Sequence, residues 1–167
     1  MQPTRDPQSQ RLLTAYVLLN GHKAFTMFDS GSNTDAVSPD FAHVAKLDVV
    51  ALDDPVTLQL GCKGSRSRIQ FGVNTTLCFG PISETAYLDV ANIDRYDLIL
   101  GTPFLTRHSI VLDFLRRAVV TRGVKVPCFS SDQDSSVLPP LPVVLRKSAK
   151  QPALPQLSAA RVLPLPV

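Results

Sequence analysis

Apolar residues recur at every second position in several short stretches of the chain, which is the period of a β-strand with one buried face. The first stretch places apolar side chains at Leu13, Ala15, Val17 and Leu19. It ends at Asn20-Gly21, a dipeptide that favours the two-residue turn of a hairpin. The pattern therefore predicts a hairpin whose return strand covers residues 24–28.

Short strands and turns of the same kind continue to residue 121. We predict a second hairpin from residues 56–60 and 68–71, a third from residues 74–79 and 83–90, and two closing strands at residues 110–114 and 118–121. Between them, an apolar run at residues 97–100 ends at Gly101, and Pro103 suits the first turn of a short helix that reaches about His108. This series predicts an all-β, barrel-like domain with one short C-terminal helix.

The distribution of prolines sets the expected limits of this domain. Eight of the 14 prolines lie at or after Pro127. Because proline removes a backbone donor and fixes φ, neither a helix nor a central strand is expected there. We expect a disordered N-terminal arm at residues 1–10, one folded domain at residues 11–126, and a proline-rich, disordered tail or linker at residues 127–167.

Charge and cysteine content argue against several classes of function. The net charge of +3 is small and the basic residues are mostly scattered, so no nucleic-acid partner is predicted. The three cysteines form no C-x-x-C pair, which argues against a disulfide framework or zinc site and favours a reducing compartment. The N-terminus does not resemble a signal peptide, and no run approaches about 18 apolar residues. We therefore expect a soluble, cytoplasmic protein without membrane association.

The candidate chemistry starts at Asp29-Ser30-Gly31, directly after the predicted strand at residues 24–28. An unpaired carboxylate is costly to bury, but a second carboxylate that shares its proton would compensate, which is how an aspartic protease activates water. Ser30 offers a hydroxyl for a buried hydrogen bond, and Gly31 allows backbone to approach backbone. Two other interpretations stay open: an ordinary turn, and a phosphodegron of the Asp-Ser-Gly-x-x-Ser type that ends at Thr34.

A second motif lies further along the chain. Residues 96–105 read Tyr-Asp-Leu-Ile-Leu-Gly-Thr-Pro-Phe-Leu, and Val-Leu-Asp-Phe follows at residues 111–114. With residues 28–32 and Ala-Val-Ser at residues 36–38, this order resembles the retropepsin domain of gypsy-class LTR retrotransposon polyproteins, a retroviral-type aspartic protease. The resemblance covers residues 12–121 and departs from the commonest pattern at Ser32, Thr102 and Phe114.

The resemblance implies a retropepsin-like half-barrel and an aspartic endopeptidase that cleaves an extended polypeptide, such as its parent polyprotein. Asp29 is the implied catalytic residue, and Ser30, Gly31 and Ser32 support its loop. The chain has a single Asp-Ser/Thr-Gly after an apolar strand. The second carboxylate must therefore come from a second copy of the chain, in a two-fold homodimer.

The resemblance also implies two further parts of the site. Ile99, Leu100 and Gly101 are expected to pack beside the active-site loop, with the glycine leaving room for that loop. Residues 58–71 correspond by position to the flap that closes over a bound peptide, and its candidate residues are Gly61, Cys62, Lys63 and Gly64. The alternative is a non-catalytic descendant, domesticated or decayed, that dimerises or binds peptides without cleaving them.

The remaining polar residues are expected to be structural. Asp35 is predicted to face solvent because no apolar strand precedes it, and the three histidines are predicted to have surface or capping roles. Asp97 is expected to hydrogen-bond locally at a strand start, and Asp113 to be structural. No group of residues suggests a metal site or a cofactor.

Overall fold

The computed structural model describes residue 4, residues 6–59 and residues 66–130 of the chain. The predicted tail at residues 131–167 and the flap residues Gly61, Cys62, Lys63 and Gly64 lie outside these described residues. Within the expected N-terminal arm, Pro7–Gln10 form a short 3-10 helix. None of the described helices is long and apolar enough to cross a membrane.

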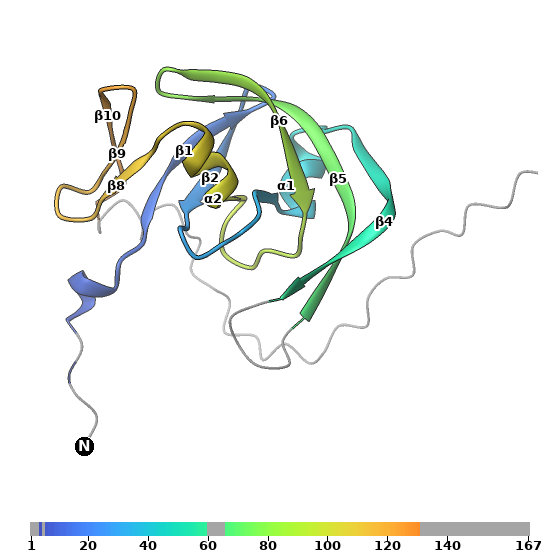
Figure 1. Cartoon of the computed structure of the whole chain (residues 1–167), viewed down its shortest axis with the longest axis horizontal. Coiled ribbons are helices and arrows are strands. Elements are labelled where there is room, and N and C mark those ends of the chain that lie inside the picture. Colours follow the sequence, from blue (N-terminus) through green and yellow to red (C-terminus); the bar gives the residue numbers. More distant parts are fainter. Residues whose placement is uncertain (1–3, 5, 60–65, 131–167) are drawn as a thin grey trace, which may run out of the picture. The chain divides into compact units, whose positions relative to one another are not determined.

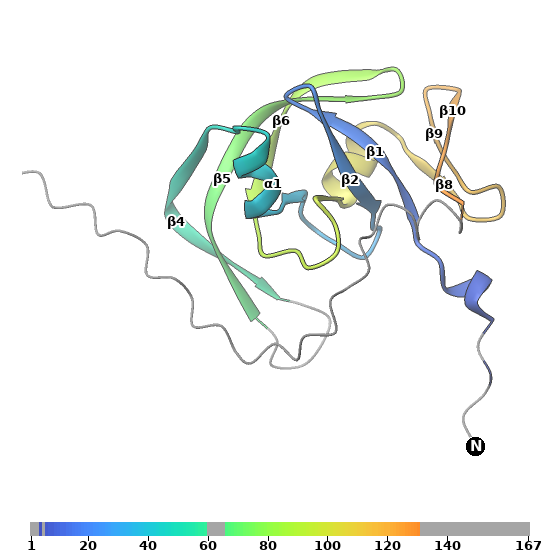
Figure 2. The ribbon, with the colours of Figure 1, turned by 180° about the vertical axis from the view of Figure 1, so that it is seen from behind.

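The described residues form ten strands in two sheets, which confirms the predicted all-β fold (Figures 1 and 2). The larger sheet has seven strands in the order β1-β2-β7-β3-β6-β5-β4, and β1 also pairs with β5, which closes a barrel and leaves β4 outside as an edge strand. These strands are β1 (Leu13–Leu19), β2 (His22–Phe28), β3 (Ala36–Val37), β4 (Val49–Gln59), β5 (Arg66–Phe79), β6 (Ile82–Val90) and β7 (Leu98–Leu100). The smaller sheet contains β8 (Val111–Asp113), β9 (Ala118–Thr121) and β10 (Val124–Pro127).

The first hairpin forms as the alternating pattern predicts. β1 pairs with β2 from Leu13 opposite Phe28 to Leu19 opposite His22. Asn20 and Gly21 both have positive φ, at 49° and 78°, as the turn that matches the twist of a hairpin requires.

β5 is a single strand where the sequence predicted two. The predicted strands at residues 68–71 and 74–79 left a gap at residues 72–73, which contains Gly72. In the fold, Tyr87 of β6 covers this glycine, and a Cβ there would lie only 2.7 Å and 2.8 Å from the ring atoms Cε2 and Cζ. Pairing with β4 on one side and β6 on the other keeps β5 continuous.

Besides the 3-10 helix at Pro7–Gln10, three elements were not predicted: β3, β10 and a helix α1 (Pro39–Val44). Ser38 caps α1, since its Oγ accepts a hydrogen bond from the N–H of Phe41 at 3.2 Å. Serine before proline is a known start signal for a helix, so this helix was detectable in the sequence. β10 folds back onto β9 at Arg122-Gly123, where both residues have positive φ.

The helix predicted from Pro103 is α2 (Thr102–Arg107), and its Phe104 and Leu105 are buried in the core. The core fills the barrel with apolar side chains from most of its strands, among them Leu19, Leu77, Leu88, Leu98 and Leu100, all at 0% exposure. Burial of a side chain of this size stabilises a fold by about 1.5–3 kcal/mol. β2 and β7 are anchored in this core and pair in parallel, so the two sequence motifs end side by side.

Ordered backbone contacts extend a little past the expected domain boundary at residue 126. Cys128 N donates to Arg117 O and Phe129 N donates to Thr14 O, both at 2.8 Å. The ring of Phe129 lies 4.9 Å from that of Tyr16, centroid to centroid. Cys128 is thus attached to the residue before β9, and Phe129 to β1.

Candidate active site

Asp29 follows the last residue of β2 and begins the connection to β3, residues 29–35, which we call the Asp29 loop. The backbone N–H of Asp29 donates to Leu100 O of β7 at 3.0 Å, and Ser32 N donates to Asp29 O at 3.2 Å. The carboxylate Oδ1 accepts a hydrogen bond from Gly31 N at 2.8 Å. Asp29 is therefore held at the end of a buried strand with its carboxylate oriented by its own loop.

Asp29 lines a cleft of about 570 Å³, within the ~300–1,000 Å³ usual for ligand sites. The cleft lies between the Asp29 loop, residues 91–96, and the hairpin strands β4 and β5, which contribute Leu58 and Ser67. Figures 1 and 2 show the last part of β4, the first part of β5 and both connections at the same end of the barrel. Asp94 is the other carboxylate in the lining.

The three residues after Asp29 differ in what they do. Ser30 is exposed, and the predicted buried hydrogen bond of its hydroxyl does not form with any of the described residues. Gly31 leaves room for the Asp29 carboxylate and not, as predicted, for another backbone segment, because a Cβ there would lie 3.2 Å from Asp29 Oδ1. Ser32 braces the loop, since its Oγ donates to Thr34 O at 2.8 Å.

Residues 99–101 lie beside the Asp29 loop. A Cβ on Gly101 would lie 2.6 Å from Ser32 O and closer still to Thr34 O. Thr102 N, one residue later, donates to Ser32 O at 2.8 Å. Leu100 is fully buried and Ile99 lines the cleft. Glycine at position 101 thus lets the loop approach β7 within hydrogen-bond distance.

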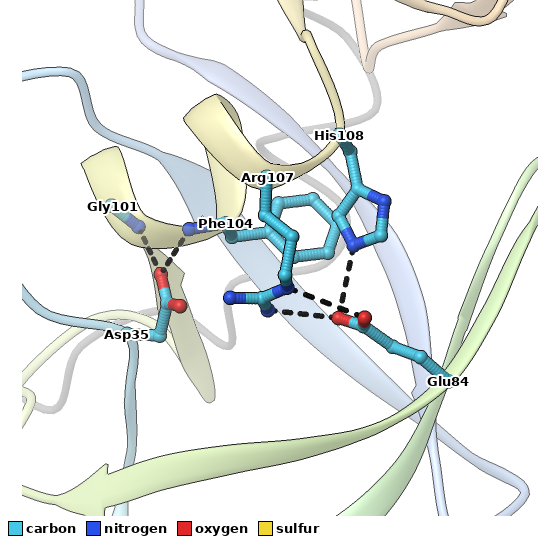
Figure 3. Close-up of polar contacts among 6 residues, drawn as sticks. All are labelled: Asp35, Glu84, Gly101, Phe104, Arg107 and His108. Carbon is cyan, nitrogen blue, oxygen red and sulfur yellow. Dashed lines mark hydrogen bonds and ion pairs between the residues drawn. The ribbon is translucent and has the colours of Figure 1, made fainter.

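Asp35 ends the loop and is only 7% exposed, so the prediction that it faces solvent is wrong. Its Oδ1 accepts hydrogen bonds from Gly101 N at 2.8 Å and Phe104 N at 3.4 Å (Figure 3). Burial raises the pKa of this carboxyl, although the two hydrogen bonds and the charge of Arg107 act in the opposite direction. The prediction failed because it considered only the residues before Asp35, whereas the start of α2 covers it.

A second polar group lies at the other end of α2 (Figure 3). Arg107 donates through Nη2 and Nε to the two oxygens of Glu84, at 2.8 Å and 3.3 Å, and His108 Nε2 lies 3.0 Å from Glu84 Oε1. Burial opposes ionisation of Glu84, but the hydrogen bonds and charges of Arg107 and His108 outweigh it and lower its pKa. His108 was predicted to have a surface or capping role. It is 6% exposed, so the surface position is wrong, but its backbone N–H caps the end of α2.

Asp97 and Asp113 both bind backbone N–H groups. Asp97 Oδ2 accepts from Phe25 N of β2 at 2.8 Å, so its hydrogen bond is long-range and not local as predicted. Asp113 accepts from Arg116 N at 2.8 Å and stabilises the turn after β8, and this bond lowers its pKa.

No group of three or more His, Cys, Asp or Glu side chains that could hold a metal ion occurs among the described residues.

Sequence reasoning missed Asp35 and the wall formed by residues 91–96. For Asp35 a signal was present, because the apolar pair Ala36-Val37 follows it directly and a strand after a carboxylate can bury it as well as a strand before it. For residues 91–96, nothing in the local pattern indicates which face of the barrel they cover. Their position depends on where β6 and β7 lie in the sheet.

Comparison with known proteins places this arrangement in a family. A family profile described as the PEG10/RTL1 protease domain matches residues 25–128. The retroviral protease-like domain of Ddi1 from Leishmania major is similar in structure, with a TM-score of 0.57 at 17% identity over 73% of this chain and 96% of that chain. EIAV protease complexed with the inhibitor HBY-793 gives a TM-score of 0.44 at 19% identity over 63% of this chain and 93% of that chain. A search of curated protein sequences gives no significant match.

The structural similarity to the Ddi1 domain, at this level of identity, supports the fold. The profile match is more specific, because it spans the Asp29 loop, the cleft and the segment at residues 99–101 that packs against the loop. The chain therefore belongs to the PEG10/RTL1 protease domain family and has a retropepsin-type fold.

Proposed function

We propose that this chain is an aspartic endopeptidase that cleaves extended polypeptides, with Asp29 as its catalytic residue. The observation that carries the proposal is the position of Asp29 in a cleft of about 570 Å³, between its loop, residues 91–96 and the β4–β5 hairpin. Membership in a protease-domain family supports it. The retrotransposon-type polyprotein is the candidate natural substrate.

The reaction needs two carboxylates that share one proton. In the proposed site, Asp29 of each of two copies contributes one. The ionised carboxylate takes a proton from water as the water oxygen attacks the carbonyl carbon of the peptide bond, and the protonated carboxyl donates its proton to the carbonyl oxygen. The tetrahedral diol then collapses as the C–N bond breaks: the carboxyl that took the water proton gives it to the leaving nitrogen, and one diol hydroxyl returns its proton to the other carboxylate, which restores the pair. No covalent bond to the enzyme forms.

Features of the single chain support a second copy at this site. Ser30, next to Asp29, is exposed and its hydroxyl bonds to none of the described residues. The Asp29 loop lies at the same end of the barrel as the last part of β4 and the first part of β5 (Figures 1 and 2). A two-fold axis beside Ser30 would bring the two carboxylates together and give both serines a partner.

The cleft walls support an extended peptide as the substrate. Leu58 and Ser67 of the hairpin strands and residues 91–96 line the cleft. A peptide between them would be held by backbone pairing, which gives affinity with limited demand on sequence.

The full-length chain and two carboxylate variants test the catalytic assignment on a mixture of unstructured peptides. Asp29→Asn should abolish cleavage, because the amide keeps the shape and an acceptor for Gly31 N but cannot act as a base. Asp94→Asn, which removes the other carboxylate of the cleft, should still cleave, with at most a changed KM. Cleavage by Asp29→Asn at the wild-type rate would rule out Asp29, and loss only in Asp94→Asn would assign the chemistry there.

Dilution tests the requirement for two copies. Cleavage per mole of chain should fall as the protein is diluted below its dimerisation constant. Constant activity per mole at concentrations where sedimentation detects only monomer would contradict the shared site. A dimer that binds peptides and cleaves none of them would favour the non-catalytic alternative.

A further inference from the structure

The Asp29 loop is attached at both of its ends to one short segment, residues 100–104. At the start of the loop, Asp29 N donates to Leu100 O at 3.0 Å, and in its middle Ser32 O accepts from Thr102 N at 2.8 Å. At its end, the Asp35 carboxylate accepts from Gly101 N and Phe104 N. The third attachment is the only one of these that depends on a side chain of the loop.

Two residues of the loop border two hollows. Asn33 and Thr34 line the cleft that contains Asp29, and they also line a second hollow of about 410 Å³, together with Asp35, Glu84 and Arg107. The loop packs closely against Gly101, where a Cβ would lie 2.6 Å from Ser32 O, and hydrogen bonds hold it at several further points. Thr34 Oγ1 adds one more bond, to Asp89 Oδ2 of β6.

Asp35 does not line the cleft, so it has no route to substrate. Its oxygen instead satisfies two backbone N–H groups at the start of α2, which would otherwise be buried without an acceptor. The charged side chains that face it are Arg107 of the same helix and Glu84 of β6, which bind each other (Figure 3). Asp35 therefore acts on the end of the loop and on the helix, and through the loop on Asp29.

We infer that Asp35 is a positioning residue for Asp29, whose buried carboxylate fixes the far end of the Asp29 loop to the start of α2. This inference rests on the proposed function for its kinetic consequence, and on the structure alone for its effect on the loop. The displacement of a catalytic group by about 1 Å can lower a rate ~100-fold, so loss of the carboxylate should lower kcat more than it changes KM.

The test compares Asp35→Ala, Asp35→Asn and the control Thr121→Val in the full-length chain. Thr121 is 1% exposed, and its hydroxyl donates to His108 O at the far end of α2, so its loss measures general destabilisation. We expect Asp35→Ala to lower kcat about 10- to 100-fold with KM changed less than about threefold. Asp35→Asn should restore kcat to within about threefold of wild type, because its amide oxygen still accepts from Gly101 N.

Amide hydrogen exchange gives a readout that does not depend on activity. In Asp35→Ala, the N–H groups of Asp29 and Thr102 should exchange faster, although their acceptors Leu100 O and Ser32 O remain. If wild type cleaves no peptide but this change occurs, the proposed function fails and the positioning role stands. The inference is overturned if kcat and exchange in Asp35→Ala match those of Thr121→Val. If Asp35→Ala does not fold, Asp35→Ser takes its place. We then expect the kcat of Asp35→Ser to be at least about threefold below that of Asp35→Asn. Equal kcat values for these two variants would overturn the inference.

Discussion

The substitution Gly101→Ala tests the closest contact of the proposed active site. Gly101 has φ −97°, which alanine adopts without strain, so any loss of stability must come from lack of space. The new Cβ would lie 2.6 Å from Ser32 O, whereas such atoms normally stay beyond 3.0 Å. The obstacle is backbone, so the Asp29 loop itself has to move by at least about 0.4 Å, the difference between these distances.

Several terms set the expected loss of stability. Forcing an extra carbon into a packed region costs about 1–3 kcal/mol. The displacement also strains the hydrogen bonds from Thr102 N to Ser32 O and from Gly101 N to Asp35, each worth about 0.5–1.5 kcal/mol net. Alanine reduces the freedom of the unfolded chain, which returns about 0.4–1 kcal/mol. We therefore expect the free energy of unfolding to fall by about 2–3 kcal/mol.

In urea unfolding, this loss should lower the urea concentration at the midpoint without changing the slope of the free energy against urea concentration. In peptide cleavage, the displacement of the loop should lower kcat. Gly123→Ala is the matched control, because nothing lies within 4 Å of its Cβ but its φ is +76°. It should lose about 1–2 kcal/mol through backbone strain and keep its kcat. A Gly101→Ala protein within about 0.5 kcal/mol of wild type and with unchanged kcat would refute the close approach.

Three further predictions concern stability. The raised pKa of Asp35 means that the folded state keeps a proton that the unfolded state has lost. The free energy of unfolding of wild type should therefore fall relative to that of Asp35→Asn as pH rises from 3.8 through the folded pKa. Urea unfolding at several pH values would contradict this if the two free energies changed in parallel with pH. Asp97→Ala leaves Phe25 N without its acceptor and should lower the free energy of unfolding by about 1–3 kcal/mol, and a loss too small to detect would show that another group replaces it. Truncation after Phe129 should preserve the melting temperature. Truncation after Val126 removes the bond to Thr14 and the ring contacts of Phe129, so it should lower the melting temperature measured by calorimetry by at least about 4 °C. Equal melting temperatures for both truncations would disprove the role of residues 127–129.

Much of the local structure could be predicted because its causes are local. The alternating apolar residues of β1 and the positive φ values of Asn20 and Gly21 depend on neighbours a few positions away, and so does the start of α2 at Pro103. The two motifs also identified Asp29 as the candidate catalytic residue before any geometry was known. In each case the physical requirement, a buried face or a special backbone angle, is met by the residues of that stretch alone.

Other features depend on segments that are far apart in the sequence. The strands predicted at residues 68–71 and 74–79 are one strand that is paired on both sides, and Asp97, which was expected to bond locally, accepts from Phe25, 72 residues earlier. Asp35 looked exposed because its partners, Gly101 and Phe104, follow 66 and 69 residues later. The sequence by itself determined most of the strands, the hairpin turn at Asn20-Gly21, the helix start at Pro103 and the candidate carboxylate. Only the tertiary structure decided which backbone N–H groups surround each acid, because burial and hydrogen bonding at these positions are set by pairing across the barrel.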